Sequence, residues 1–410
     1  MSRRDIYYWK CDRPAAFHGT QTRGEVDAKM EQQLSEALQH HFDARVVVLS
    51  PGTGQGTHLT WNADVDGKSM FVRVENGPEK DGHLAVESAV LDRVRDAGVL
   101  TPRVYACDAT RSRVPFAWQA LERIAAPDLN HWFKQDALEV PRIAFEVGRA
   151  VAKWQSMSFE GFGVLYGVGW ECRAAGLLNA LATPSHDFPT ALESVQQRDV
   201  LNPSGSLAKD NFDAATSNAP NIPNLQGCHA TYADYFHLRL GEHLRFLVAR
   251  GFLSGGDEIM TEIENHRALL DLPQGCFVHK DLALWNILGT RDQIAAFIDF
   301  DDAISGDPMD DLSLLACFHD AAFLKRAFEG YQSHRALPPE YLHRFWLHLL
   351  RNMIVKAVIR VGAGYFDRDD GFFLIGSGSS GASLREMTHS RLALALRGLR
   401  EGSGLDILSP

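Results

Sequence analysis

The hydrophobic pattern of the chain changes its period near residue 125, and this change limits the possible folds more than any other feature. Before it, short β-rich segments at residues 45–50, 58–65 and 69–75 are separated by a glycine-rich stretch and an Asp-Gly turn. Beyond it, apolar residues recur at helical spacing over long segments. Consecutive short strands joined by tight turns predict an antiparallel meander. We therefore expect an α+β architecture, with a small β-rich lobe ahead of a larger, mostly helical lobe.

The same patterns divide the chain into three parts. Residues 1–44 are predicted to form an N-terminal extension and a helix, residues 45–124 the β-rich lobe, and residues 125–410 the helical lobe. A stretch around 200–227 is rich in Asn, Pro, Ser and Ala, which predicts a long surface loop or insertion. Helices are expected at residues 25–42, 84–97, 143–156, 232–250, 257–272, 312–331, 338–361 and 381–401, with further strands at 103–108 and 115–123.

Charge and composition weigh against several functional classes. Acidic residues outnumber Lys and Arg by 52 to 41, and the net charge of −11 disfavours nucleic-acid binding, which depends on neutralising phosphates. No stretch approaches the roughly 18 apolar residues that a membrane span requires, and the N-terminus lacks the apolar core of a signal peptide. The six cysteines are scattered without a CxxC pair, which argues against a zinc knuckle or a disulfide framework. We therefore expect a cytoplasmic protein without nucleic-acid or membrane partners.

Polar residues between short apolar segments carry the strongest chemical signal. The segment FVHKDLALWNIL, which begins at residue 277, contains His279, Asp281 and Asn286. Asp299 follows 13 residues after Asn286, in the segment IDFDD. Phosphoryl transfer needs a carboxylate that accepts a proton from the hydroxyl nucleophile, and oxygen ligands that hold Mg²⁺ against the phosphates. Asp281 can supply the first group, while Asn286 and Asp299 carry oxygens of the kind that Mg²⁺ prefers.

These residues resemble a motif set of the aminoglycoside phosphotransferase and choline kinase families, within the wider protein-kinase-like fold. Those families carry an H-G-D-x-H-x-x-N loop, then I-D-F/W-D/E, then G-D-P-x-x-D-L-A. The matching residues here are His279, Asp281, Asn286, Asp299, Gly306, Asp307, Pro308 and the run from Asp311 to Ser313. The specific match covers a catalytic loop region at residues 276–315.

The resemblance implies a two-lobed protein-kinase-like fold with ATP and Mg²⁺ as cofactors. It further implies that Asp281 is the catalytic base, that Asn286 and Asp299 bind the metal, and that Asp311 braces the loop without touching substrate. Three positions depart from the family pattern, because Lys280 replaces glycine, Ala283 replaces a second histidine and Trp285 is unusually bulky. We expect Lys280 to face the solvent or the phosphates.

The β-rich lobe contains candidates for nucleotide binding. Gly52, Gly54 and Gly56 lie between the first two expected strands, where backbone N–H groups free of Cβ atoms can approach phosphates. A plain hairpin loop would show the same spacing. The resemblance implies that Arg73, on the third strand, contacts the phosphates and pairs with Glu87 in the following helix. The alternative for Glu87 is a solvated glutamate on the helix surface.

The segment ALERI at residues 120–124 resembles the family's hinge between the lobes. The resemblance implies that the backbone of Glu122 and Ile124 hydrogen-bonds adenine. Trp154 and Gln155 stand where relatives carry a Leu-His pair, and we expect both to pack in the core.

The motifs together predict an ATP-dependent kinase that phosphorylates a hydroxyl of a sugar, polyol or amino alcohol. Substrate would dock against the helical lobe, where the mixture of His, Arg and Asp favours a neutral or mildly anionic acceptor. Candidate lining residues there are His319, Asp320, Trp346, Arg351 and Tyr365. The alternatives are an aminoglycoside acceptor, transfer of AMP in place of phosphate, and a degenerate nucleotide-binding regulatory protein. The oligomeric state has no signature in the sequence.

Overall fold

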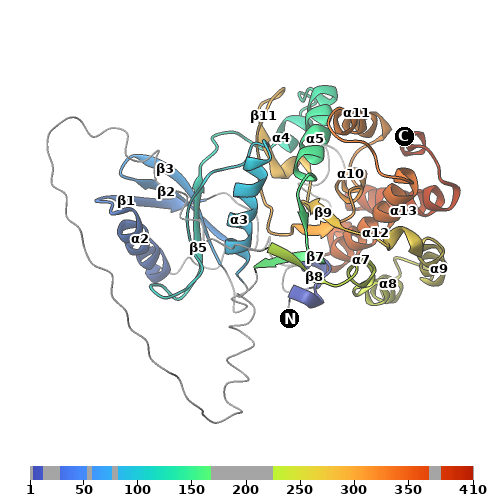
Figure 1. Cartoon of the computed structure of the whole chain (residues 1–410), viewed down its shortest axis with the longest axis horizontal. Helices are drawn as coiled ribbons and strands as arrows, with labels where there is room; N and C mark the ends of the chain where they lie inside the picture. The colour runs from blue at the N-terminus through green and yellow to red at the C-terminus, as the bar shows by residue number, and fades with distance from the viewer. Residues whose placement is uncertain are drawn as a thin grey trace, which may run out of the picture.

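Two lobes make up the molecule in the computed structural model, which describes residues 3–12, 28–52, 58–75, 82–167, 225–368 and 380–409 (Figure 1). The first lobe is built on a five-stranded antiparallel sheet, and the second consists of helices around a smaller sheet and a β-hairpin. The predicted α+β architecture is therefore confirmed. Within these residues, no helix is both long and apolar enough to cross a membrane.

The first three strands of the first lobe form the predicted meander, and two more strands extend the sheet. The sheet has the order β1-β2-β3-β5-β4, with every neighbouring pair antiparallel. The strands are β1 (Val47–Pro51), β2 (Leu59–Val65), β3 (Lys68–Val74), β4 (Val104–Asp108) and β5 (Trp118–Glu122). The Asp-Gly turn between β2 and β3 has positive φ at both central residues, 49° at Asp66 and 85° at Gly67, as the tightest hairpins require.

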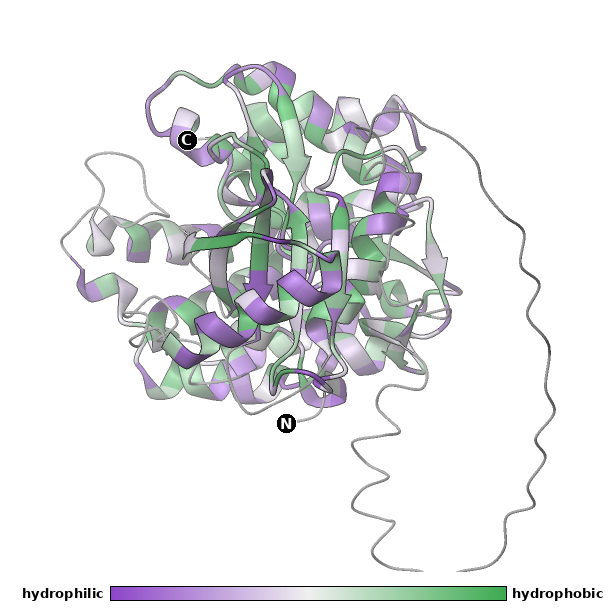
Figure 2. Ribbon diagram, turned by 90° about the vertical axis from the view of Figure 1, so that its left-hand side faces the viewer, coloured by the Kyte–Doolittle hydropathy of each residue, from purple (hydrophilic) through white to green (hydrophobic). Residues whose placement is uncertain are grey.

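Two helices pack against this sheet, one on each face. α2 (Ala28–Phe42) packs Leu34 and Leu38 into the cluster that contains Met70 and Val72 of β3. Because side chains alternate along a strand, Arg73 points to the other face, toward α3 (His83–Asp96). α3 lies between the sheet and the second lobe (Figure 1). Figure 2 shows hydrophobic residues concentrated along the inner strands and hydrophilic residues along outer helices.

The second lobe contains a five-stranded sheet that the sequence patterns do not reveal. Its order is β6-β9-β12-β7-β8, and strands of two to six residues are too short to show a clear alternation. The strands are β6 (Ser158–Phe159), β7 (Phe162–Gly167), β8 (Leu225–His229), β9 (Gly275–Val278) and β12 (Ile304–Gly306), and a separate hairpin joins β10 (Ile287–Gly289) to β11 (Ile294–Phe297). Residues 225–227, expected in the insertion, belong to β8, whereas the rest of that stretch lies outside the described residues.

Helices form most of the second lobe. They are α4 (Leu129–Phe133), α5 (Val140–Trp154), α7 (Tyr232–His237), α8 (Leu240–Ala249), α9 (Asp257–Asn265), α10 (Asp310–Leu315), α11 (Ala321–Gln332), α12 (Tyr341–Gly362) and α13 (Gly381–Glu401). Short 3₁₀ turns lie at η3 (Arg267–Leu270), η4 (Leu284–Asn286), η5 (Tyr365–Asp367) and η6 (Leu405–Leu408).

The expectation of single helices was wrong at residues 232–250, 257–272 and 312–331. The first is interrupted at Arg239, whose φ is 57°, and the second gives way to η3 after Asn265. The third is interrupted before α11, where the Asp320 side chain accepts a hydrogen bond from the Phe323 N–H and so starts a new helix. Helical periodicity continues through all three interruptions, which explains why the spacing alone did not locate them.

The N-terminal residues divide between the two lobes. α2 packs on the first lobe, whereas residues 3–12, with η1 (Arg3–Asp5) and α1 (Trp9–Asp12), pack on the second. Tyr7 and Tyr8 are buried there, and the Tyr7 ring stacks on Tyr235 with 4.8 Å between the ring centroids. We call residues 3–12 the N-terminal segment.

Candidate active site

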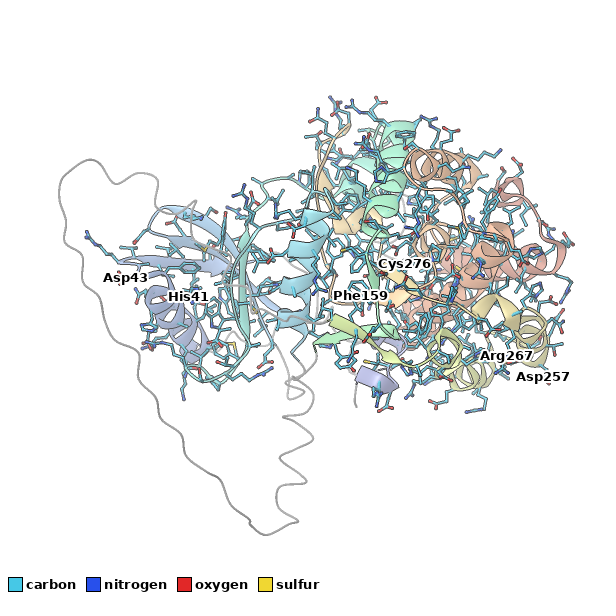
Figure 3. All side chains as sticks on the ribbon, viewed as in Figure 1. His41, Asp43, Phe159, Asp257, Arg267 and Cys276 are labelled. Carbon is cyan, nitrogen blue, oxygen red and sulfur yellow. The ribbon has the colours of Figure 1, made fainter. Side chains whose placement is uncertain are left out.

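The catalytic loop begins at β9 and runs into the β10–β11 hairpin at the boundary between the lobes. Figure 3 labels Phe159 of β6 and Cys276 of β9, the paired strands that lead into this loop. In the hairpin, Ile287 pairs with Phe297, and the Ile298 N–H donates to the Asn286 carbonyl at 3.0 Å. This register brings Asn286 and Asp299 to the same end of the hairpin, although they lie 13 residues apart in the sequence.

Asp281 is buried and held from two directions. The side-chain amide nitrogen of Asn286 donates to the Asp281 carbonyl at 2.8 Å and to its Oδ2 at 3.2 Å. The Lys356 ammonium lies 3.4 Å from the other carboxylate oxygen, Oδ1. Because the Asn286 nitrogen is used in this way, its amide oxygen is the atom left for a metal ion. The Lys356 charge favours the ionised carboxylate that a general base requires.

Asp311 and His279 fix the shape of the loop. The Asp311 carboxylate accepts hydrogen bonds from the N–H groups of His279 and Lys280, both at 3.1 Å, and burial raises the pKa of Asp311. Trp154 packs in the core as predicted, and its indole N–H also donates to Asp311 at 3.0 Å. The Asp281 N–H donates to Nδ1 of His279 at 3.3 Å, so Nε2 carries the proton that is donated to the Ile298 carbonyl at 3.0 Å.

Lys280 does not face the solvent or the phosphates, and this expectation was wrong. Its side chain is buried, with Nζ 2.7 Å from Oδ2 of Asp310, 3.1 Å from the Tyr7 hydroxyl and 3.2 Å from Oδ1 of Asn352. The φ of Lys280 is 70°, a left-handed conformation that explains why the related families place glycine here. The side chain turns inward because Asp310 supplies a buried counter-charge.

Arg73 is the centre of a charged group on the first-lobe side of Asp281, where the nucleotide is predicted to bind. Its guanidinium pairs with Glu87 through Nη1, while Nη2 lies 2.9 Å from Nδ1 of His58, 3.3 Å from Asp299 and 3.2 Å from Asp301. Burial acts to lower the pKa of Arg73, but Glu87 and both aspartates outweigh it and raise that pKa. We call these five residues the nucleotide-side cluster.

Glu87 ties this cluster to the Asp299 segment. The residue is 1% exposed, so the alternative of a solvated surface glutamate is wrong. Its second carboxylate oxygen accepts a hydrogen bond from the Phe300 N–H at 3.3 Å. Burial raises the pKa of Glu87, and the adjacent Arg73 charge opposes that rise. α3 therefore sets the position of both Arg73 and the residue that follows Asp299.

The remaining nucleotide-binding candidates are described only in part. The Gly52 N–H donates to the Thr60 carbonyl at 2.9 Å, and a Cβ at this glycine would lie 2.7 Å from the Thr60 hydroxyl. Gly54 and Gly56 lie outside the described residues. In the hinge, the Glu122 N–H is already bonded to the Arg103 carbonyl at 2.8 Å. Contacts of Glu122 and Ile124 with adenine stay a prediction.

Several residues expected to line the acceptor site are packed between helices, and their role in the acceptor site stays a prediction. Arg351 is buried and donates to the carbonyls of Phe236 and Leu238, and the Trp346 indole donates to the Ser403 carbonyl. His319 is buried against the Phe323 ring, and Tyr365 packs in a small cluster with Leu384. These polar and aromatic side chains serve the packing between helices. The spacing of residues in the sequence does not distinguish this role from a role in binding.

Lys356 and Tyr8 are site residues that the sequence reasoning missed. Lys356 lies 75 residues after Asp281 in an apolar helix, and Tyr8 belongs to the N-terminal segment. Burial raises the pKa of Tyr8, and the Asp281 charge contributes to that rise, which places the phenol beside the carboxylate. The Lys356 ammonium lies 5.1 Å from the Tyr8 ring centroid. No local motif marks either residue.

A second group of metal-type ligands lies near the N-terminal segment but does not fit a metal. Cys11, Asp12 and His243 bring their ligand atoms within 4.8 Å of one another. However, Nη1 of Arg351 lies 3.1 Å from Nδ1 of His243 and must donate to it, so Nε2 carries the proton that is donated to Asp12 at 2.7 Å. The Nε2 lone pair that a metal needs is therefore absent, and the group anchors the segment instead.

Comparisons with known proteins agree with this geometry. A model described as the phosphotransferase enzyme family matches residues 50–343 of the chain. Among solved structures, the aminoglycoside phosphotransferase APH(4)-Ia is similar, with 14% identity and a TM-score of 0.54 over 91% of this chain and all of that chain. No curated protein matches the chain.

Two further solved structures share the fold. One is a thermostable mutant of APH(4)-Ia in a ternary complex with ADP and hygromycin B, with 14% identity and a TM-score of 0.53 over 91% of this chain and 99% of that chain. The other is a protein from Haemophilus somnus 129PT, provisionally named a fructosamine-3-kinase, with 14% identity and a TM-score of 0.50 over 88% of this chain and 97% of that chain. At these identities the likeness shows the fold, and it confirms the predicted protein-kinase-like architecture.

Proposed function

The chain belongs to the phosphotransferase enzyme family, and from that premise we propose that it transfers the γ-phosphoryl group of ATP to a hydroxyl of a small molecule. The observation that carries the proposal is the placement of Asp281. This carboxylate is held by Asn286 at the hairpin end where Asp299 also lies, next to the nucleotide-side cluster. The proposal assigns to these neighbouring residues the roles of a base, two oxygen ligands and a phosphate-binding cation.

The residues present fit a magnesium ion. Asn286 offers an amide oxygen whose orientation is set by its nitrogen, and the Asp299 side chain is 35% exposed and accessible. Both are hard oxygen donors. Mg²⁺ bound there would neutralise phosphate charge and orient the transferred group. Arg73 would contact the phosphates from the β3 side. Its permanent charge and its position beside Asp299 support this role.

In the proposed reaction, the acceptor oxygen attacks the γ-phosphorus of ATP. Asp281 takes the hydroxyl proton, and the bond between the γ-phosphorus and the bridging oxygen breaks, so that ADP leaves with the electron pair. The Lys356 ammonium, 3.4 Å from Oδ1, would stabilise the carboxylate form of Asp281. Catalysis rests on positioning and on charge stabilisation, which the rigid bonds of the loop provide.

For the acceptor, we propose a sugar, polyol or amino alcohol. An aminoglycoside is the alternative, because a fold neighbour is titled as a complex with ADP and hygromycin B. The joint presence of Asp281, Asn286 and Asp299 in linked positions argues against a regulatory protein without turnover.

The test is acceptor-dependent ADP formation from Mg·ATP, with Asp281→Asn as the matched control. We expect a product that is heavier than the acceptor by one phosphate in mass spectrometry. A product heavier by a nucleotide would instead establish AMP transfer. Absence of Mg·ATP binding in calorimetry would contradict the proposal as a whole.

A further inference from the structure

Two cations of α12 lie on the same side of the catalytic centre. Lys356 and Arg360 are four residues apart, so they share one helix face. Their charged groups lie 5.5 and 6.0 Å from the centroid of the Phe318 ring. That ring meets the Trp285 ring of the catalytic loop edge-on, with 4.8 Å between the centroids. Both cations therefore lie on the side of α12 that faces Phe318, whose ring contacts the catalytic loop, and Lys356 also reaches Asp281.

Arg360 is a buried guanidinium without an anionic partner in the described part of the chain. It is 2% exposed, and among the described residues its side chain makes a hydrogen bond from Nη1 to the Thr388 hydroxyl at 2.7 Å. Its Nε and Nη2 atoms have no acceptor among the described residues. These two groups share one edge of the guanidinium, the edge that grips a carboxylate or phosphate with two parallel hydrogen bonds. Burial lowers the pKa of Arg360 to about 10, and no acid reverses this.

The charges around Arg360 are also mainly positive. Burial raises the pKa of Cys317 to about 11 and Asp310 adds to that rise, whereas Lys356, Arg360 and Arg391 each act to lower it. Three cations and one acid therefore act on this thiol, and the acid is itself paired with Lys280. Asp320 is the acid that acts on Arg391, and its carboxylate is occupied in capping α11. We call Lys356, Arg360 and Arg391 the α12-side cluster. Its field attracts an anion and repels a polycation.

We propose that the acceptor carries an anionic group, a carboxylate or a phosphate, that binds Lys356 and Arg360 while its hydroxyl lies at Asp281. The inference rests on the proposed kinase function and names the class of its substrate. Four helical residues span about 6 Å, so the anion lies about one helical turn from the base. A small hydroxy acid, sugar acid or sugar phosphate matches that distance, whereas an aminoglycoside would bring positive charge to this cluster.

The test compares acceptors that share a carbon skeleton and differ in charge. D-Glucose is neutral, D-glucosamine is cationic, D-gluconate carries a carboxylate and D-glucose 6-phosphate carries a phosphate. We expect kcat/KM to be at least about tenfold higher for an anionic member than for the neutral and cationic members, the effect of one charge-assisted contact. The two anionic arms distinguish a carboxylate from a phosphate. Equal or better turnover of glucose or glucosamine would overturn the inference.

Substitutions of Arg360 then locate the anion. Arg360→Gln and Arg360→Met should raise KM for the anionic acceptor about tenfold or more, with less than twofold change in kcat. Arg400→Gln is the matched control, because it removes the same charge from an exposed position on α13, and it should change neither constant. Arg360→Met should also leave the melting temperature equal or higher, since it removes an uncompensated buried charge. A lower melting temperature with an unchanged acceptor preference would assign Arg360 a purely structural role and overturn the proposal.

A direct binding measurement separates this inference from the kinase proposal. If the protein binds Mg·ATP but phosphorylates none of the four acceptors, calorimetry with Mg·ADP present should still detect gluconate or glucose 6-phosphate binding that Arg360→Met abolishes. Absence of that binding would refute the anionic-acceptor inference and leave the kinase proposal standing. Absence of Mg·ATP binding would refute the kinase proposal itself.

Discussion

The two charged regions that flank Asp281 differ in how their cations are neutralised. In the nucleotide-side cluster, Arg73 contacts three carboxylates, from Glu87, Asp299 and Asp301. In the α12-side cluster, Lys356 pairs with Asp281, whereas Arg360 meets one hydroxyl and no carboxylate among the described residues. The first region is assembled by its own ion pairs before any ligand arrives. The second region leaves positive charge for a ligand to neutralise. The difference indicates that the protein supplies the negative charge in the first region, whereas a ligand would supply it in the second.

The largest expected effect comes from the residue between the two regions. Asp281→Asn should lower kcat by roughly 10³-fold, within the range for loss of a general base, because the amide cannot accept the hydroxyl proton. Mg·ATP affinity should stay nearly unchanged, since the base contacts the acceptor. Steady-state kinetics and calorimetry on the same preparation check both parts. Turnover like that of the wild type would remove the assignment of Asp281.

On the nucleotide side, Asp299→Ala should weaken Mg·ATP binding and turnover together. It removes a charged oxygen ligand and also one counter-ion of Arg73. We expect a loss of about 10²-fold in kcat/KM, the scale of one electrostatic contact to a developing charge. Calorimetry at several Mg²⁺ concentrations measures the binding part. If magnesium-dependent affinity and activity both persist, Asp301 becomes the candidate ligand.

A third prediction contrasts a compensated buried cation with Arg360. Lys280→Gly relieves the left-handed backbone strain but leaves Asp310 buried without its ion pair. Breaking a buried pair costs about 3 kcal/mol, more than the strain relief of about 1 kcal/mol, so the variant should unfold more easily. Chemical denaturation measures the free energy of unfolding. The double variant Lys280→Gly/Asp310→Asn should recover part of the stability that Lys280→Gly loses. If Lys280→Gly were as stable as the wild type, the ion pair with Asp310 would not be what distinguishes the buried Lys280 from the buried Arg360.

The last prediction is measured per pH unit and concerns His319, which adjoins the α12-side cluster. Burial lowers the pKa of His319 to about 3, so this side chain is neutral in the folded protein and adds no positive charge there. Its pKa in the unfolded chain is near 6.5, so the unfolded state binds the extra proton as the pH falls from about 6.5 to 3. Stability should fall by about 1.4 kcal/mol per pH unit across that window. His319→Gln should flatten this slope in denaturation curves, and an unchanged slope would contradict the assignment.

The sequence predicted the first lobe and the catalytic loop well because both depend on local patterns. The meander follows from short alternating strands and the Asp66-Gly67 turn, and the loop follows from the spacing of Asp281, Asn286 and Asp299. Trp154 was rightly expected in the core, but its bond to Asp311 spans 157 residues and has no local signature.

The rest of the site depends on tertiary contacts that spacing does not encode. Lys356 reaches Asp281 only because α12 packs against the loop, and Tyr8 arrives from the opposite end of the chain. Lys280 was misjudged because the buried acid that draws it inward, Asp310, occupies a position that the family motif leaves open. The apolar runs beside the catalytic residues did indicate β9, β10 and β11, whereas β6, β7, β8 and β12 were not predicted, since two to six residues carry too little periodicity.

The contact between the N-terminal segment and Lys280 has a consequence for the order of biosynthesis. The Tyr7 hydroxyl and the Lys280 ammonium are separated by 273 residues, and Asn352, the third member of their network, is made later still. The segment therefore leaves the ribosome long before its partners exist. The entropy cost of closing a loop grows only slowly with its length, so the late docking adds little to the free energy of folding. The late docking nevertheless postpones the final arrangement of the catalytic loop. A nascent chain that stops before α12 would carry every motif residue of the active site and still lack its completed geometry.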